Sequence, residues 1–233
     1  MRRNKFLWLG ILFCFLGCAR DTYLITSDGV RIAYEYKTVK GENGTAVLLH
    51  GYGSSLEEWY DFGKFLRAHG WSTLAFDFRG HGMSTEWRGK EIEWKQLTES
   101  GRLSMIKDIE AVVKFIPVPR NLWLIGSSVG ANLALNFAAD HPEAAGVVLL
   151  SPGFNYGGIE SQPAMEKYGS RPVLIAGSED DPGTPKICML LQQKARGENR
   201  LLLYEKAGHG SAMLESEKGL QGEILKWMNL HRN

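Results

Sequence analysis

The chain has 233 residues, of which 44% are hydrophobic and 23% charged, and its formal net charge is +1. These values are ordinary for a globular protein, and the length suits a single domain whose core needs no disulfide or metal. A net charge so close to zero argues against a nucleic-acid partner.

The first residues of the chain carry export signals. Residues 1–5 are basic, and an almost unbroken apolar run follows at 6–16. A helix needs about 20 apolar residues to cross a membrane. This run is too short for that, and after a basic start it predicts a secretory signal peptide.

The sequence at Cys18 indicates a lipid anchor. Leu16, Gly17, Cys18 and Ala19 resemble the lipobox of bacterial lipoproteins, although Phe15 stands where that motif usually carries Leu. The resemblance implies that residues 1–17 are removed, that Cys18 is lipidated and that 18–233 form one mature domain. We expect a bacterial cell-envelope protein held on a membrane by this lipid, with the outer membrane favoured. Secretion after an ordinary signal peptide, or an uncleaved anchor, are the alternatives.

The rest of the chain alternates between two patterns. Residues 23–26 and 30–36 flank Asp28-Gly29, which predicts a β-hairpin. Short apolar runs then suit strands that are buried on both faces of a parallel sheet. These runs are 46–49, 73–76, 122–125, 146–150, 173–176 and 201–204.

The segments between these runs space their apolar residues as amphipathic helices do. They are 56–69, 104–115, 128–139, 184–195 and 211–230. Strand–helix alternation predicts the α/β class, with a doubly wound, mostly parallel sheet flanked by helices. The polar stretch 86–101, with Trp87 and Trp94, is long for a connection and predicts a flap near the site.

Residues 126–130 (GSSVG) fit the pattern G-x-S-x-G between a predicted strand and a predicted helix. That context predicts a sharp turn that exposes Ser128 as a nucleophile. The first N–H groups of the helix then face a developing oxyanion, and that of Val129 is the nearest donor. Residues 50–53 (HGYG) follow another strand, and we expect the backbone of Tyr52 to supply the second donor.

A serine hydroxyl needs a neighbouring imidazole to take its proton. His209 is the candidate base, because it lies in a glycine-rich loop between the last predicted strand and the last predicted helix. The acid that orients this imidazole should lie between Ser128 and His209 in the chain. Asp181 is favoured because it precedes Pro182 at the start of a turn, and Asp180 is the alternative.

No cofactor or metal is expected. The chain has no H-E-x-x-H sequence, no Cys and His at metal-ligand spacing and no G-x-G-x-x-G fingerprint. If Cys18 is lipidated, Cys188 is the one thiol left in the mature chain. Its apolar surroundings predict a buried structural residue.

These features together resemble the α/β-hydrolase superfamily of serine hydrolases, from about Asp21 to the end of the chain. Residues 77–84 (DFRGHGMS) are similar to the D-x-R-G-H-G-x-S turn of monoacylglycerol-lipase-like and lysophospholipase-like members. That resemblance implies that His81 is structural. Only a short segment separates Leu150 from Val173, where many relatives carry a helical cap, so we expect a minimal cap or none.

The expected activity is hydrolysis of small-molecule carboxylic esters, like that of a carboxylesterase or lipase, through a Ser-His-Asp triad and an acyl-enzyme intermediate. A thioesterase, a lysophospholipase, a peptidase or an acyltransferase could use the same residues. A non-catalytic binding protein of the same fold is the alternative from another class.

Overall fold

The structure is a computed structural model that describes residues 23–117 and 120–232. The predicted signal peptide at 1–17 and Cys18 lie outside the described residues, so both remain predictions. Within the described ranges, no helix combines the length and the apolar character needed to span a bilayer.

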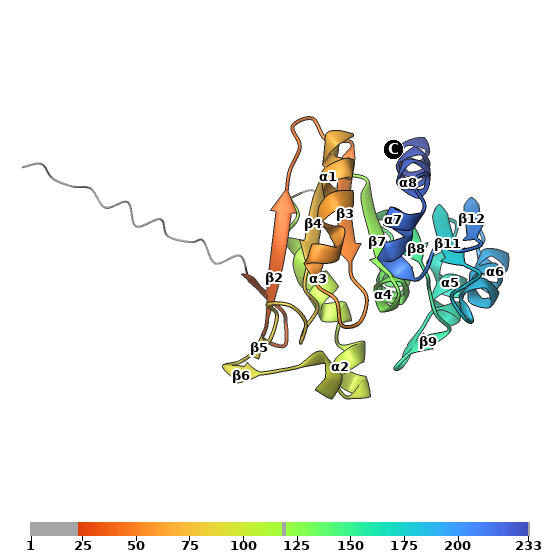
Figure 1. Cartoon of the computed structure of the whole chain (residues 1–233). Helices are drawn as coiled ribbons and strands as arrows, with labels where there is room; N and C mark the ends of the chain where they lie inside the picture. The colour runs from red at the N-terminus through yellow and green to blue at the C-terminus, as the bar shows by residue number, and fades with distance from the viewer. Residues whose placement is uncertain (1–22, 118–119, 233) are drawn as a thin grey trace, which may run out of the picture.

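A twisted sheet runs through the centre of the molecule (Figure 1). Its strand order is β12-β11-β8-β7-β3-β4-β2-β5-β6, with β1 paired to β2. The run from β12 to β4 is parallel, and β2 joins it antiparallel. The strands are β1 (Tyr23–Ile25), β2 (Val30–Lys37), β3 (Gly44–Leu49), β4 (Trp71–Phe76), β5 (Glu86–Trp87), β6 (Lys90–Glu91), β7 (Leu122–Ser127), β8 (Ala144–Leu150), β11 (Val173–Ser178) and β12 (Asn199–Tyr204), and β9 (Asn155–Tyr156) and β10 (Ile159–Glu160) form a separate pair.

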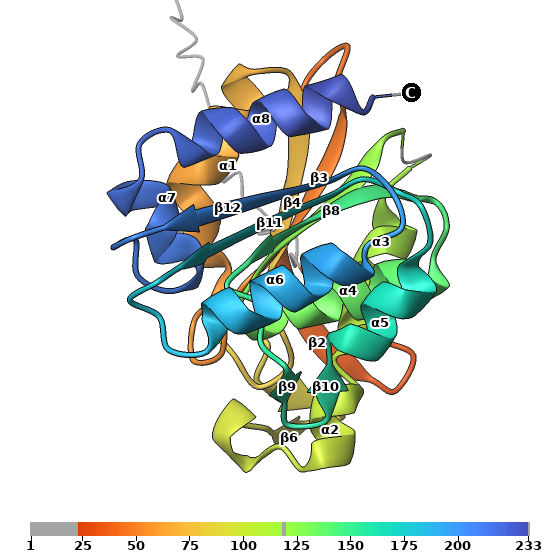
Figure 2. The same cartoon turned by 90° about the vertical axis from the view of Figure 1, so that its right-hand side faces the viewer.

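Helices cover both faces of the sheet (Figure 2). One face carries α1 and α8, whose Phe62 and Ile224 belong to one buried cluster, and the other carries α3 to α6 over a second cluster. The helices are α1 (Tyr60–Ala68), α2 (Glu99–Leu103), α3 (Ile106–Phe115), α4 (Val129–Asp140), α5 (Gln162–Tyr168), α6 (Thr184–Lys194), α7 (Met213–Ser216) and α8 (Leu220–Leu230), with short 3₁₀ turns η1 (Leu56–Trp59), η2 (Trp94–Gln96) and η3 (Gly210–Ala212). The predicted doubly wound α/β sheet is confirmed.

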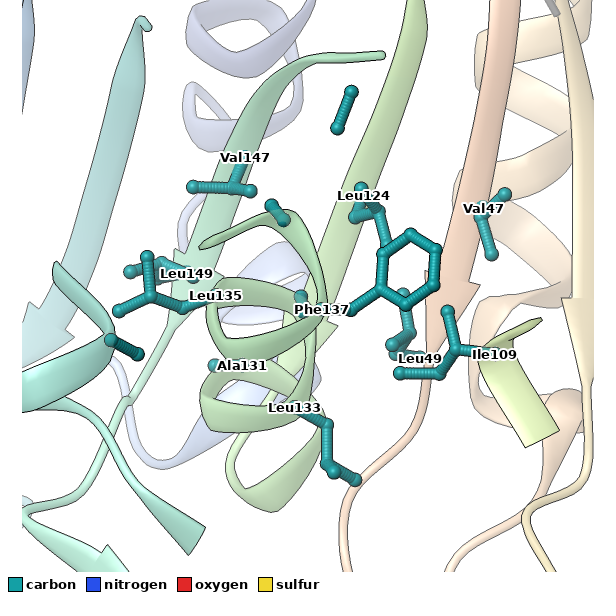
Figure 3. Close-up of a cluster of buried hydrophobic side chains, with 14 of the residues drawn as sticks. Val47, Leu49, Ile109, Leu124, Ala131, Leu133, Leu135, Phe137, Val147 and Leu149 are labelled. Carbon is teal, nitrogen blue, oxygen red and sulfur yellow. The ribbon is translucent and has the colours of Figure 1, made fainter. Parts of the chain in front are cut away.

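The central strands are buried over their whole length. Every residue of β3, β4, β7 and β11 is buried, as expected for apolar runs covered by helices on both sides. Figure 3 shows Leu133, Leu135 and Phe137 of α4 projecting among Val47, Leu124 and other residues of β3, β7 and β8. The middle of the sheet therefore forms a tightly packed surface on which α4 lies.

Several predicted helices are shorter than the sequence indicated. The segment 56–69 begins as the 3₁₀ turn η1, because the Ser55 hydroxyl accepts from the Glu57 N–H ahead of α1. Segment 104–115 becomes helical only at Ile106, after the separate helix α2. The single helix expected at 211–230 is wrong. The chain forms η3 and α7 and starts α8 after Gly219, a residue that disfavours helix interiors.

A buried ion pair fixes the turn that follows β4. The Arg79 guanidinium donates to Asp108 on α3 at 2.7 and 2.9 Å and to Asp28 at 2.9 and 3.1 Å. Burial opposes the charge on Arg79, but the two carboxylates raise its pKa above the ordinary value. Removing one charge would leave its partner buried and poorly compensated.

We predict that Asp108→Asn lowers the free energy of unfolding by about 3 kcal/mol, because Arg79 then keeps its charge in a buried site with one carboxylate fewer. Urea unfolding followed by circular dichroism measures this loss. The control is Asp140→Asn, which removes the carboxylate of an exposed pair with Lys167 and should change stability little. Equal effects of the two variants would contradict the prediction.

Candidate active site

Ser128 lies in a sharp turn between β7 and α4. Its backbone has φ 56° and ψ −121°, a conformation that costs energy for any residue other than glycine. Neighbouring backbone hydrogen bonds hold the turn. The Ser128 N–H donates to the Leu150 carbonyl at 2.8 Å, and the Ser128 carbonyl accepts from Ala131 N–H at 2.9 Å. Observed strain of this kind occurs at functional sites when the surrounding structure fixes it.

The glycines at 126 and 130 make this turn sterically possible. A Cβ atom on Gly126 would lie 2.2 Å from the Gly130 carbonyl oxygen, and one on Gly130 would lie 2.2 Å from the carbonyl oxygen of Leu49. The first turn of α4 therefore packs directly on the backbone at the end of β3. No other residue type leaves room for this contact.

The register of the sheet brings the His50 loop to the same point. Leu49 of β3 pairs with Gly126 of β7, so the loops that follow these strands leave the sheet side by side. A Cβ atom on Gly51 would lie 3.4 Å from the Ser128 Cβ. Tyr52 follows in this loop, and Val129 opens α4, whose first N–H groups have no acceptor within the helix. The two predicted oxyanion donors, Tyr52 and Val129, thus lie in the His50 loop and at the start of α4, on segments that are close to Ser128.

His50 and His81 support this loop rather than facing a substrate. His50 is fully buried, its Nε2 accepts from Phe78 N–H at 3.0 Å, and its Nδ1 contacts the Gly51 carbonyl at 2.7 Å. Burial lowers the pKa of His50 to about 3, so its ring is neutral. His81 is also buried, and its ring centroid lies 6.1 Å from that of Tyr52 and 5.4 Å from that of Trp94, which are 5.8 Å apart. The predicted flap therefore touches the His50 loop through the contact of Trp94 with Tyr52.

His209 meets an acid across the end of the sheet. It lies in the loop after β12, and its Nδ1 is 2.6 Å from Oδ2 of Asp181, which follows β11. Thr184 Oγ1 donates to the same Asp181 oxygen at 2.6 Å. A carboxylate at Nδ1 keeps a proton on that nitrogen and leaves Nε2 as an acceptor. Half of the His209 side chain remains open to solvent.

Asp180, the alternative acid, has other partners. Its carboxylate accepts from the Ser178 hydroxyl and from Gly208 N–H, and these hydrogen bonds lower its pKa. Asp180 therefore fastens the loop just before His209, whereas Asp181 contacts the imidazole itself. The sequence favoured Asp181 with Asp180 as the alternative, and the two residues have different contacts.

Two further serines hold the His209 loop against the Ser128 turn. The Ser127 hydroxyl accepts from Ser211 N–H at 2.9 Å, and the Ser151 hydroxyl accepts from Gly210 N–H at 2.8 Å. Neither serine was identified as a supporting residue from the sequence, because each contact spans more than 50 residues of chain. The position of His209 thus depends on side chains from β7 and from the end of β8.

The described residues contain no group of three or more His, Cys, Asp or Glu side chains arranged to bind a metal ion. Cys188 on α6 is buried, and burial raises the pKa of its thiol to about 12. The predicted structural role of Cys188 agrees with this burial, because a thiol held protonated is a poor nucleophile.

Comparison with known families agrees with this arrangement. Residues 41–171, more than half of the chain, match the family described as serine aminopeptidase, S33. The chain belongs to this α/β-hydrolase family. The matched residues of this α/β hydrolase include Tyr52, Ser128 and Val129. Asp181 and His209 lie beyond them, so their pairing is known from geometry alone.

Solved structures share the fold of this α/β hydrolase. The esterase EaEST from Exiguobacterium antarcticum is 17% identical, with a TM-score of 0.72 over 89% of this chain and 98% of that one. The Pyrococcus furiosus esterase Pf2001 is 19% identical, with a TM-score of 0.72 over 90% and 91%. An enol-lactonase from Burkholderia xenovorans LB400 is 15% identical, with a TM-score of 0.73 over 88% and 99%. Identities this low establish the common fold only.

The close packing of α4 leads to a test by glycine substitution. We predict that Gly130→Ala lowers the free energy of unfolding of this α/β hydrolase by about 1–3 kcal/mol, because the new methyl group meets the Leu49 carbonyl. The control is Gly222→Ala in α8, where nothing lies within 4 Å and alanine should stabilise the helix by up to about 1 kcal/mol. Urea unfolding measures both, and a stabilising Gly130→Ala would refute the tight-turn argument.

Proposed function

We propose that this chain is a serine hydrolase that cleaves carboxylic esters of small molecules. The observation that carries the proposal is the 2.6 Å contact between His209 and Asp181 at the same end of the sheet as the strained Ser128 turn. A nucleophile, a base and a residue that orients the base are the parts that acyl transfer requires.

In this mechanism Ser128 Oγ attacks the ester carbonyl carbon while its proton passes to His209 Nε2. The N–H groups of Tyr52 and Val129 hold the negative oxygen that develops. Donors of this kind each contribute about 10²–10³-fold to the rate. The bond to the leaving oxygen then breaks as His209 returns the proton to it. Water, deprotonated by His209, next attacks the acyl group and releases Ser128.

The names of similar structures favour esters over other acyl compounds. Among them are two esterases, the enol-lactonase, which acts on a cyclic ester, and a protein called Est1E from Butyrivibrio proteoclasticus with bound ferulic acid. The description of the matched family makes aminopeptidase activity the second candidate. We also propose that the protein works at the bacterial cell envelope on a lipid anchor, and this part is based on the leader sequence alone.

The first test identifies the nucleophile. We predict that a fluorophosphonate probe labels the unaltered protein and that Ser128→Ala abolishes the labelling, because the probe reacts only with an activated serine. Ser170→Ala, which alters an exposed serine, is the control and should label fully. Turnover of 4-nitrophenyl esters and of aminoacyl 4-nitroanilides then separates the esterase from the aminopeptidase. Failure of the folded protein to label would favour a binding protein.

The second test separates the two acids. We predict that Asp181→Asn lowers kcat/KM for a 4-nitrophenyl ester by about 10³–10⁴-fold, since the amide no longer keeps the proton on Nδ1 of His209. Asp180→Asn removes a loop contact and should cost less than about 10-fold. Steady-state kinetics on both variants measures the difference. A larger loss in Asp180→Asn would reverse the assignment.

A further inference from the structure

A short hairpin stands where many relatives carry a cap. After β8 the chain forms β9 and β10, joined by the turn Gly157-Gly158, and then α5. The hairpin and α2 lie at the same end of the molecule in both views (Figures 1 and 2). Arg102 of α2 donates from Nε to the Gly157 carbonyl at 3.1 Å, so the two segments touch.

The hairpin is fastened to the helix that begins at Ser128. Asn132, fully buried on α4, donates from Nδ2 to the carbonyls of Gly153 and Ile159 at 2.9 and 2.8 Å, and its Oδ1 accepts from Gly153 N–H at 3.0 Å. Asn132 is one helical turn beyond Ser128 and therefore lies on the same side of α4. One rigid support thus positions both Ser128 and the hairpin.

Tyr156 extends from this hairpin to Ser128. Its ring fills the space beside Gly153, where a Cβ atom would lie 2.6 Å from it. Its hydroxyl donates to the Ser151 carbonyl at a long 3.5 Å, and the Ser128 hydroxyl lies close enough to lower the pKa of Tyr156. Burial raises the pKa of Tyr156, and the Ser128 contact offsets this only in part, so the phenol keeps its proton near neutral pH. The Tyr156 hydroxyl therefore stays protonated close to Ser128, and its proton is held by a long hydrogen bond to the Ser151 carbonyl.

The same tyrosine lines a pocket next to His209. Tyr156, Phe154 and Ile187 form its walls together with His209 and Asp181, and its volume is about 280 Å³. In acyl transfer the histidine protonates the leaving group, so the leaving group must lie on the histidine's side of the scissile bond. Because His209 lines the pocket, the pocket is on the histidine's side of that bond. Its volume is just below the usual range for small-molecule sites, which suits a compact alcohol or phenol.

We propose that Tyr156 donates a hydrogen bond to the leaving-group oxygen, and that the pocket beside His209 holds the leaving alcohol. This inference rests on the proposed ester hydrolysis. As the tetrahedral intermediate collapses, the carbon–oxygen bond breaks and its electrons go to the leaving oxygen. The proton that His209 took from Ser128 moves to that oxygen. Tyr156 keeps its own proton throughout and stabilises the charge that develops before the transfer is complete.

The test compares two esters with the same acyl group and leaving groups of similar size. 4-Nitrophenyl acetate releases an acidic phenol, whose leaving oxygen needs little stabilisation of its negative charge. 4-Nitrobenzyl acetate releases an ordinary alcohol, whose leaving oxygen needs much more. In Tyr156→Phe we expect kcat/KM for the nitrobenzyl ester to fall by about 10- to 100-fold and that for the nitrophenyl ester by less than about threefold. The phenylalanine ring keeps the space beside Gly153 filled, so the fold should be retained.

Tyr60→Phe is the matched control, because Tyr60 is exposed on α1 and its loss should leave both esters unaffected. Fluorophosphonate labelling of Tyr156→Phe checks that Ser128 is still activated. If the unaltered protein cleaves both esters and Tyr156→Phe loses kcat/KM equally for both, the leaving-group role of Tyr156 is overturned and the proposed function stays intact. An unaltered protein that neither labels nor cleaves either ester would overturn the proposed function, and this inference with it.

Discussion

A serine with a positive φ joins the central strand β7 to α4, and only glycine at 126 and 130 allows so tight a turn. The backbone of α4 lies against the end of β3, and the His50 loop passes so close that a Cβ atom on Gly51 would lie 3.4 Å from the Ser128 Cβ. Because the strands beneath are buried on both faces, the turn cannot relax by moving the sheet. The strain at Ser128 is therefore supported by the packing of the core.

The other half of the site is held by polar contacts. His209 extends from the edge of the sheet, where the residues of β12 are only partly buried. Its loop is fastened by the hydroxyls of Ser127 and Ser151 and by the carboxylate of Asp180, and its ring by Asp181. The site thus joins a turn fixed by packing to a loop fixed by hydrogen bonds.

The sequence predicted most of the sheet, because apolar runs such as 122–125 have few alternatives once helices cover both faces. It predicted Ser128 and His209 from local glycine patterns. It favoured Asp181 but kept Asp180 as an alternative, since a shift of one residue in a turn changes which carboxylate contacts the imidazole. No local sequence pattern predicted a role for Tyr156, because its position near Ser128 depends on the hydrogen bonds from Asn132 to a loop distant in sequence.

The hydrogen bonds of Asn132 also determine which part of the hairpin can change in length. Asn132 binds the hairpin at Gly153, ahead of β9, and at Ile159, which follows the Gly157-Gly158 turn with its positive φ values. Residues inserted at the tip would replace its contact with Arg102 of α2, whereas the contact of Asn132 with Gly153 would remain. The length of this hairpin can therefore change at Gly157 while Asn132 holds its start, and with it the approach of Tyr156, against the helix that begins at Ser128.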